Sequence, residues 1–127
     1  MGANAIGYEM TKAEVDFVRK SWNDCSAYLT ICGGVLAPLK AGILGGKTVT
    51  APFGIIPSLQ QQHPGTNWVG KRWQRDGKLW TSGASLNGLD LMRAFCSETW
   101  GNGSGDLIDK MGKMGAWPVR DVDFNDA

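Results

Sequence analysis

The stretch Tyr28-Leu-Thr-Ile-Cys-Gly-Gly-Val35 decides the fold, because it contains a strand, a sharp turn and the start of a helix. Residues 28–31 are aromatic, aliphatic or β-branched, which suits a buried strand. Cys32 follows directly, and then come two glycines, which tolerate strained backbone angles and allow other groups to approach closely. Residues 35–39 suit a helix. We therefore predict that Cys32 lies on a strand-to-helix turn.

A side chain on such a turn is raised off the sheet and lies beside the positive end of a helix. This position exposes a nucleophile and can lower the pKa of a thiol. Cys32 is therefore the candidate catalytic nucleophile, and the backbone N–H groups of Gly33 and Gly34 are the natural donors to an oxyanion. The alternative is a buried structural thiol, which is the usual role of a free cysteine.

The composition is that of an ordinary globular protein. The chain has 127 residues, enough for a single domain over 1–127. The hydrophobic content is 43%, the charged content 20% and the formal net charge +1. This balance argues against nucleic-acid binding, which needs a basic excess or a basic face. No apolar run approaches the roughly 20 residues of a membrane span, and no secretory signal is visible.

The cysteines predict an intracellular protein. They are Cys25, Cys32 and Cys96, an odd number at wide spacing, which favours reduced thiols and a cytoplasmic location. There is no CxxC pair, and the only histidine is His63, so we expect no metal site. Nothing in the sequence indicates a cofactor.

The remaining patterns alternate between helix and strand. Thr11 and Glu14 form a capping box at the start of a helix. Asp76-Gly77 is a strong hairpin signal. Further predicted elements are a strand at 48–51, a helix at 54–62, an alternating stretch at 68–74, a strand at 79–82, a helix at 86–97, a glycine-rich loop at 100–105, a helix at 106–114 and an irregular acidic tail at 116–127. This order predicts an α/β fold with a largely parallel sheet.

Several polar and aromatic residues allow two interpretations. Ser85 and Asn87 either line the edge of a substrate pocket or cap the helix that follows. Asp90 lies in the first turn of that helix, where the dipole alone favours a carboxylate, so we expect a structural role. His63 suits a solvated turn. The three tryptophans near the hairpin suit cross-strand packing, a ligand or a partner surface: Trp68, Trp73 and Trp80.

Four segments together resemble the ThiJ/PfpI superfamily, related to class I glutamine amidotransferase domains, and in particular its fungal members. They are residues 27–34 around the cysteine, 39–50 with the pattern Gly-Ile-Leu-Gly-Gly-Lys-Thr-Val-Thr, 67–80 through the hairpin, and 80–90 with Ser-Gly-Ala-Ser-Leu-Asn-Gly-Leu-Asp. The resemblance implies a flavodoxin-like parallel sheet flanked by helices, with a β-hairpin, and a cysteine on a nucleophile elbow.

The sequence departs from the family pattern in two ways. Family members have roughly 80–100 residues before the equivalent of Thr11, about half a domain. That part contains the first strands and the acidic residue that hydrogen-bonds the cysteine, so we expect a partial domain. The histidine that many members carry after the next strand is also absent, because the local sequence is Val49-Thr-Ala-Pro52. A sheet without its first strands exposes an edge, so we expect a homodimer or another oligomer.

The resemblance implies an enzyme of the lyase or hydratase type. Cys32 would attack or polarise a small electrophilic carbonyl or an isocyanide, or the protein would tailor a secondary metabolite. The partner would be a small-molecule substrate. The alternative is a catalytically inactive half-domain that serves as a binding module or oligomeric scaffold, and a third possibility is that the sequence is one piece of a larger chain.

Overall fold

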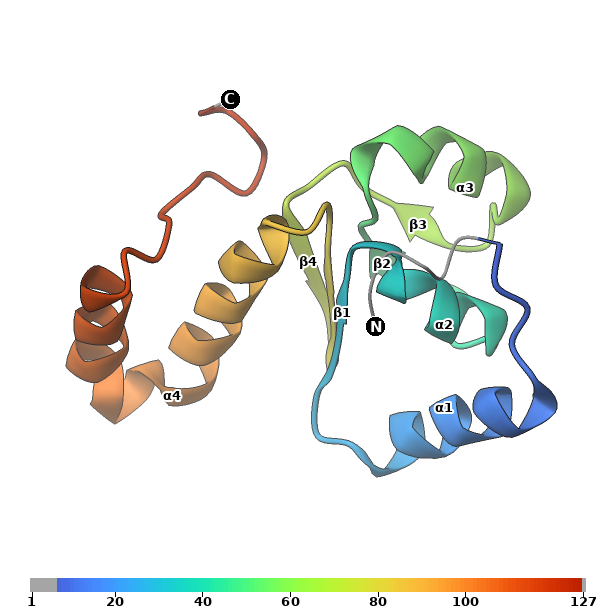
Figure 1. Ribbon diagram of the computed structural model, residues 1–127, viewed down its shortest axis with the longest axis horizontal. Helices are drawn as coiled ribbons and strands as arrows, with labels where there is room; N and C mark the ends of the chain where they lie inside the picture. The colour runs from blue at the N-terminus through green and yellow to red at the C-terminus, as the bar shows by residue number, and fades with distance from the viewer. Residues whose placement is uncertain (1–6, 127) are drawn as a thin grey trace.

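The computed structural model describes residues 7–126 and has a mixed α/β architecture (Figure 1). The elements are α1 (Lys12–Asp24), β1 (Tyr28–Ile31), η2 (Cys32–Val35), α2 (Leu36–Lys40), β2 (Thr48–Val49), η3 (Phe53–Ile55), α3 (Ile56–Gln62), β3 (Asn67–Trp68), β4 (Trp73–Asp76), β5 (Leu79–Ser82) and α4 (Asn87–Met114). β1 and β4 lie between α4 on one side and α1, α2 and α3 on the other. This confirms the predicted fold class.

The first sheet contains one parallel pair and the predicted hairpin. β1 pairs with β5 in parallel, and β5 pairs with β4 in antiparallel orientation, so the order is β1-β5-β4. The β4–β5 hairpin turns at Asp76-Gly77, where Gly77 has a φ of +60°. Across it, the rings of Trp73 and Trp80 stack at 5.7 Å. The hairpin prediction and the cross-strand interpretation of these two tryptophans are confirmed.

The alternating stretch 68–74 is divided between two strands, which the sequence did not predict. β3 pairs with β2 in parallel in a small second sheet, whereas β4 belongs to the first sheet. Between them lies Gly70, where a Cβ atom would approach the Phe53 ring to 3.2 Å. Buried threonines connect the two sheets: the Thr50 N–H donates to Thr81 Oγ1 at 2.9 Å, and Thr50 Oγ1 donates to the Lys71 carbonyl at 2.8 Å.

The main hydrophobic core holds the segment after Cys32 in place. Val35 is completely buried, and Gly33 and Gly34 are buried beside it. The other buried members of the cluster are Leu44, Val49, Ala51, Ile56, Leu59, Trp68 and Leu79. The backbone that follows the cysteine is therefore fixed by packing against both sheets and α3.

α4 differs from the prediction of two helices joined by a loop. Its backbone is helical from Asn87 to Met114, so the predicted loop at 100–105 is wrong. The helix nevertheless turns back on itself (Figure 1). Arg93 Nη2 lies 3.6 Å from Asp109 Oδ1, although these residues would be about 24 Å apart in a straight helix. The glycine-rich stretch 101–105 explains the reversal, because glycine is a weak helix former.

The capping box at the start of α1 is present as predicted. The Glu14 N–H donates to Thr11 Oγ1, and the Thr11 N–H donates to Glu14 Oε2 at 2.8 Å. α1 packs through Val18 against Ala37 and Ala41, beside the helix that follows the cysteine.

We expect Thr11→Ala to lower the free energy of unfolding by about 1 kcal/mol, because the substitution removes the N-cap acceptor. Urea denaturation of the variant and of Thr11→Ser, which keeps the hydroxyl, provides the measurement. Equal stability of the two variants would contradict this role of the cap.

Candidate functional site

Cys32 lies at the carboxyl end of β1 with its backbone in the left-handed region. Its φ is +57°, a conformation that costs a non-glycine residue about 1–2 kcal/mol. The preceding Ile31 is extended, with φ −122° and ψ 130°, and the following residues form the short helices η2 and α2. This is the strand–turn–helix arrangement that the sequence predicts. The catalytic roles of Cys32, Gly33 and Gly34 stay predictions.

The register of the first sheet places Arg72 at the same edge as the end of β1. Ile31 lies opposite Ser82, and Ser82 lies opposite Trp73. One step further along, the Gly83 N–H donates to the Arg72 carbonyl at 2.9 Å. Cys32 follows Ile31 directly but begins η2, so it leaves the sheet at this edge. Ligands of open α/β sheets bind at this carboxyl edge.

Two buried hydroxyls near the cysteine have no hydrogen-bond partner among the described residues. They are Thr30 Oγ1 on β1 and Ser82 Oγ at the end of β5. A buried hydroxyl without a partner is destabilising, so each is a polar group available to a further acceptor or donor. Neither residue stands out in the sequence, because serine and threonine at the end of a strand are common.

The two predicted substrate-binding residues lie just beyond Gly83. The Ser85 side chain is exposed, whereas Asn87 is buried, and its Nδ2 donates to Asp90 Oδ2 at 3.4 Å. The N-cap of α4 is Leu86, and no side chain caps the helix. The alternative interpretation, in which Ser85 or Asn87 caps the helix, is therefore wrong. Asn87 is also held by packing, because a Cβ atom at Gly83 would lie 2.8 Å from its Oδ1.

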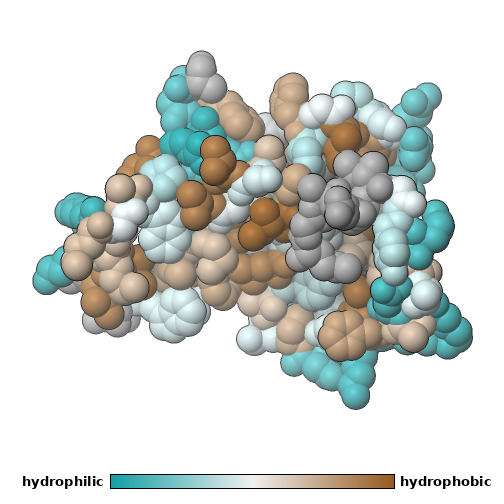
Figure 2. Space-filling view, in the orientation of Figure 1, coloured by the Kyte–Doolittle hydropathy of each residue, from teal (hydrophilic) through white to brown (hydrophobic). Residues whose placement is uncertain are grey.

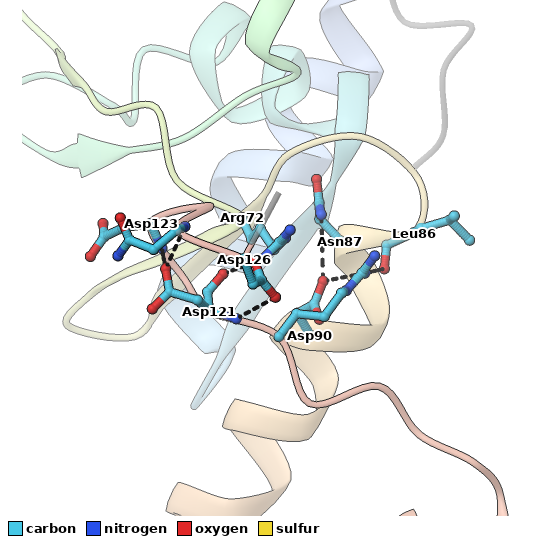
Figure 3. A network of polar contacts seen from close by, with 9 residues as sticks. Arg72, Leu86, Asn87, Asp90, Asp121, Asp123 and Asp126 are labelled. Carbon is cyan, nitrogen blue, oxygen red and sulfur yellow. Dashed lines mark hydrogen bonds and ion pairs between the residues drawn. The ribbon is translucent and has the colours of Figure 1, made fainter.

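Asp90 is paired with an arginine that the sequence analysis missed. Its carboxylate is 3% exposed, and it accepts from Arg120 Nε at 3.0 Å and Nη2 at 2.5 Å (Figure 3). Arg120 Nη2 also donates to the Leu86 carbonyl. The hydrogen bond to Asp90 raises the pKa of Arg120. Such a pair favours the structural role predicted for Asp90, and it fixes the tail against the start of α4.

Arg72 forms the second attachment of the tail. Its side chain is 7% exposed, and Nη1 donates to the Asp121 carbonyl and, at 2.5 Å, to Asp126 Oδ1 (Figure 3). The Arg72 N–H donates to the Val122 carbonyl, and the Phe124 ring lies 4.5 Å from the guanidinium carbon. The hydrogen bond from Arg72 lowers the pKa of Asp126. The acidic tail therefore lies across this edge of the sheet, where its contacts with Arg72 hold it.

The remaining candidate features lie apart from Cys32. An apolar groove of about 360 Å³ runs between α2 and α3, and His63 at the end of α3 contributes to it, but Cys32 does not. Cys25, Cys32 and Cys96 are all free thiols. Within residues 7–126, no group of three His, Cys, Asp or Glu side chains could hold a metal ion, and no helix is long and apolar enough to cross a membrane.

We expect Arg120→Ala to lower the free energy of unfolding by about 3 kcal/mol, because it leaves the Asp90 carboxylate buried without its countercharge. Lys113→Ala, which breaks an exposed ion pair with Asp109, should leave it almost unchanged. Denaturant unfolding measures both. A loss no larger than that of the control would show that the Asp90 pair does not anchor the tail.

Comparison with known proteins places the chain in a family. The fold is similar to Drosophila melanogaster DJ-1β (TM-score 0.67, 20% identity, 83% of this chain and 54% of that one). It is also similar to a ThiJ/PfpI family protein from Pseudomonas syringae (0.70, 20%, 91% and 45%) and an AraC family transcriptional regulator from Pseudomonas putida (0.65, 15%, 83% and 57%).

The chain therefore spans about half the length of these solved relatives. No curated protein matches the sequence. The model of the DJ-1/PfpI family matches residues 3–98, which include the strand, the cysteine turn and the start of α4 but not the tail. The chain belongs to the DJ-1/PfpI family.

Proposed function

We propose that the protein is a cysteine-dependent enzyme of the lyase or hydratase type, acting on a small electrophilic carbonyl or isocyanide. The observation that carries the proposal is the left-handed backbone of Cys32, with φ +57° between a strand and a helix. Strain of this kind concentrates at active sites, where it holds a reactive group in place. A larger metabolite is the alternative substrate, which the exposed Ser85 side chain would meet first.

The proposed reaction follows from the position of Cys32 on the strand-to-helix turn. The Cys32 sulfur adds to the electrophilic carbon, and the electron pair of the carbonyl moves onto its oxygen. The first N–H groups of a helix have no partner within it, so Gly33 and Gly34 are the expected donors to that oxygen. None of the hydrogen bonds among residues 7–126 involves the Cys32 sulfur.

We expect Cys32→Ser to abolish turnover of methylglyoxal, because the hydroxyl is a far weaker nucleophile than a thiolate. Cys25→Ser and Cys96→Ser are the matched controls, since both thiols are free and partly buried, and they should keep full activity. Product formation is measured with each folded variant. Full activity of Cys32→Ser, or no turnover of aldehydes and isocyanides by the unmodified protein, would contradict the enzyme proposal.

A second candidate function is an inactive half-domain that serves as a scaffold. It is favoured by one observation, namely that the chain covers 45–57% of the solved relatives reported above.

In either case we propose a single partial domain over 1–127 that forms a homodimer in the cytoplasm. β1 lies at an edge of its sheet, and Ile31 on it packs against Gly88 at the start of α4.

Exposed apolar side chains support the dimer. Leu86 is 67% exposed and Leu89 is 46% exposed, and in the sequence they lie on either side of Gly88, against which Ile31 packs. Figure 2 shows hydrophobic residues gathered toward the middle of the visible face and hydrophilic ones mainly at its rim. An exposed edge strand with apolar neighbours is a template for pairing with another chain.

We expect light scattering to give twice the mass of the 13.7 kDa chain. We further expect Leu89→Lys to shift the protein towards the monomer, since it places a charge in the apolar patch. Lys20→Glu on the exposed face of α1 serves as the control. A monomer with a cooperative thermal transition would exclude the dimer.

A further inference from the structure

The free edge of β1 carries backbone groups that the fold does not pair. On the other edge, the Tyr28 N–H donates to the Lys78 carbonyl across the parallel pairing with β5. The N–H and C=O groups of a strand point to alternate sides from one residue to the next, so those of Leu29 and Ile31 point away from β5. No other backbone hydrogen bond among residues 7–126 uses the groups of Leu29. β1 therefore presents an edge that can accept another strand.

The groups on this edge are complementary to a second copy of the same edge. The donors are the N–H groups of Leu29 and Ile31, and Leu29 also offers its carbonyl. The Ala27 carbonyl is a further acceptor, because the C=O and N–H of a trans peptide point in opposite directions and the Tyr28 N–H points to β5. The Ile31 carbonyl is engaged, because Ile31 is the N-cap of η2 and its carbonyl accepts the first hydrogen bond of that helix. An antiparallel copy can supply a free acceptor for each free donor.

The engaged carbonyls select one register for such a pair. A two-fold axis at Thr30 would pair Leu29 with Ile31 of the second copy and would need the Ile31 carbonyl as an acceptor. An axis at Ile31 would need the same carbonyl.

An axis at Tyr28 meets a similar obstacle. It would place the Ile31 N–H opposite the Cys25 carbonyl, which already accepts from Lys78 Nζ at 3.2 Å. An axis at Leu29 pairs Leu29 with its own copy and the Ile31 N–H with the Ala27 carbonyl. The Leu29 register therefore joins the free donors to free acceptors.

The side chains of the edge suit the same register. Because side chains alternate between the faces of a strand, Ala27, Leu29 and Ile31 lie on one face, where Ile31 packs against Gly88 of α4. All three are apolar, and Ile31 is 36% exposed. In the Leu29 register the large Ile31 side chain lies opposite the small Ala27 side chain of the second copy. The two edges then form one continuous apolar row.

We propose that two copies of the chain pair through their β1 edges, antiparallel and with the two-fold axis at Leu29, to form one continuous sheet. This interface rests on the homodimer proposed above and gives it a specific register. The two cysteine turns lie at opposite ends of the shared strand pair, because Cys32 follows Ile31 directly. The segment that precedes Ala27 in the second copy passes beside each turn. The second copy therefore forms part of the wall of the candidate site.

Disulfide cross-linking at Leu29 tests the register. In the proposed pair the two Leu29 Cα atoms lie about 5.5 Å apart, within the range of a disulfide, whereas an axis at Thr30 would separate them by about 8 Å. Leu29→Cys, in a chain whose three native cysteines are replaced by serine, should form a cross-linked dimer with oxidised glutathione. Phe17→Cys in the same chain is the control, because Phe17 is 71% exposed on α1, and it should stay largely uncross-linked.

A second variant removes the central donor in the otherwise unmodified chain. Leu29→Pro lacks the outward N–H but keeps the hydrogen bonds to β5, so it should weaken the dimer by about tenfold or more in analytical ultracentrifugation. Leu29→Val keeps the N–H and is its matched control.

The outcomes separate this interface from the dimer itself. A protein with the mass of a dimer in which Leu29→Cys cross-links no better than Phe17→Cys overturns the interface and leaves the homodimer standing. A monomer at all concentrations overturns both, and the edge is then left to another polypeptide. The cross-linking comparison holds even if Leu29→Pro does not fold, and the turnover of Cys32→Ser tests the enzyme proposal separately.

Discussion

The parallel pairing of β1 with β5 is the constraint on which the rest of the structure depends. It joins segments about fifty residues apart and aligns Ile31 with Ser82. Because side chains alternate between the two faces of a strand, a slip of one residue would turn Cys32 away from its present position. The antiparallel return of β4 extends the same row to Arg72. One register therefore sets three features: the turn at the cysteine, the start of α4, and the place where the tail contacts the sheet.

The features that the sequence predicted correctly are those with short-range causes. The capping box at Thr11, the hairpin at Asp76-Gly77 and the strand before Cys32 each depend on residues within four positions of one another. The division of 68–74 between two sheets depends instead on the Phe53 ring beside Gly70. The reversal of α4 likewise depends on how its two halves pack. Neither contact leaves a periodic signal in the sequence.

The contacts of the tail do not follow from its composition. Its three aspartates predicted an irregular acidic segment, yet a buried guanidinium and a buried carboxylate elsewhere each need a countercharge. Arg120 is the single basic residue of that segment, and it pairs with Asp90. Asp126 pairs with Arg72. The single arginine in an otherwise acidic tail was the signal available in the sequence. Which carboxylate it pairs with is decided by the tertiary structure.

The geometry of the cysteine turn and its chemistry have separate origins. The left-handed backbone at Cys32 persists because the surroundings determine it on both sides, through the pairing of β1 and the complete burial of Val35. None of these contacts requires an acid. The hydrogen bonds of the described residues include one from the Cys25 sulfur but none with the Cys32 sulfur. Thr30 on β1 and Ser82 at the end of β5 carry buried hydroxyls that also have no partner among the described residues. The strained backbone of Cys32 and two unpaired hydroxyls therefore lie at the paired ends of β1 and β5.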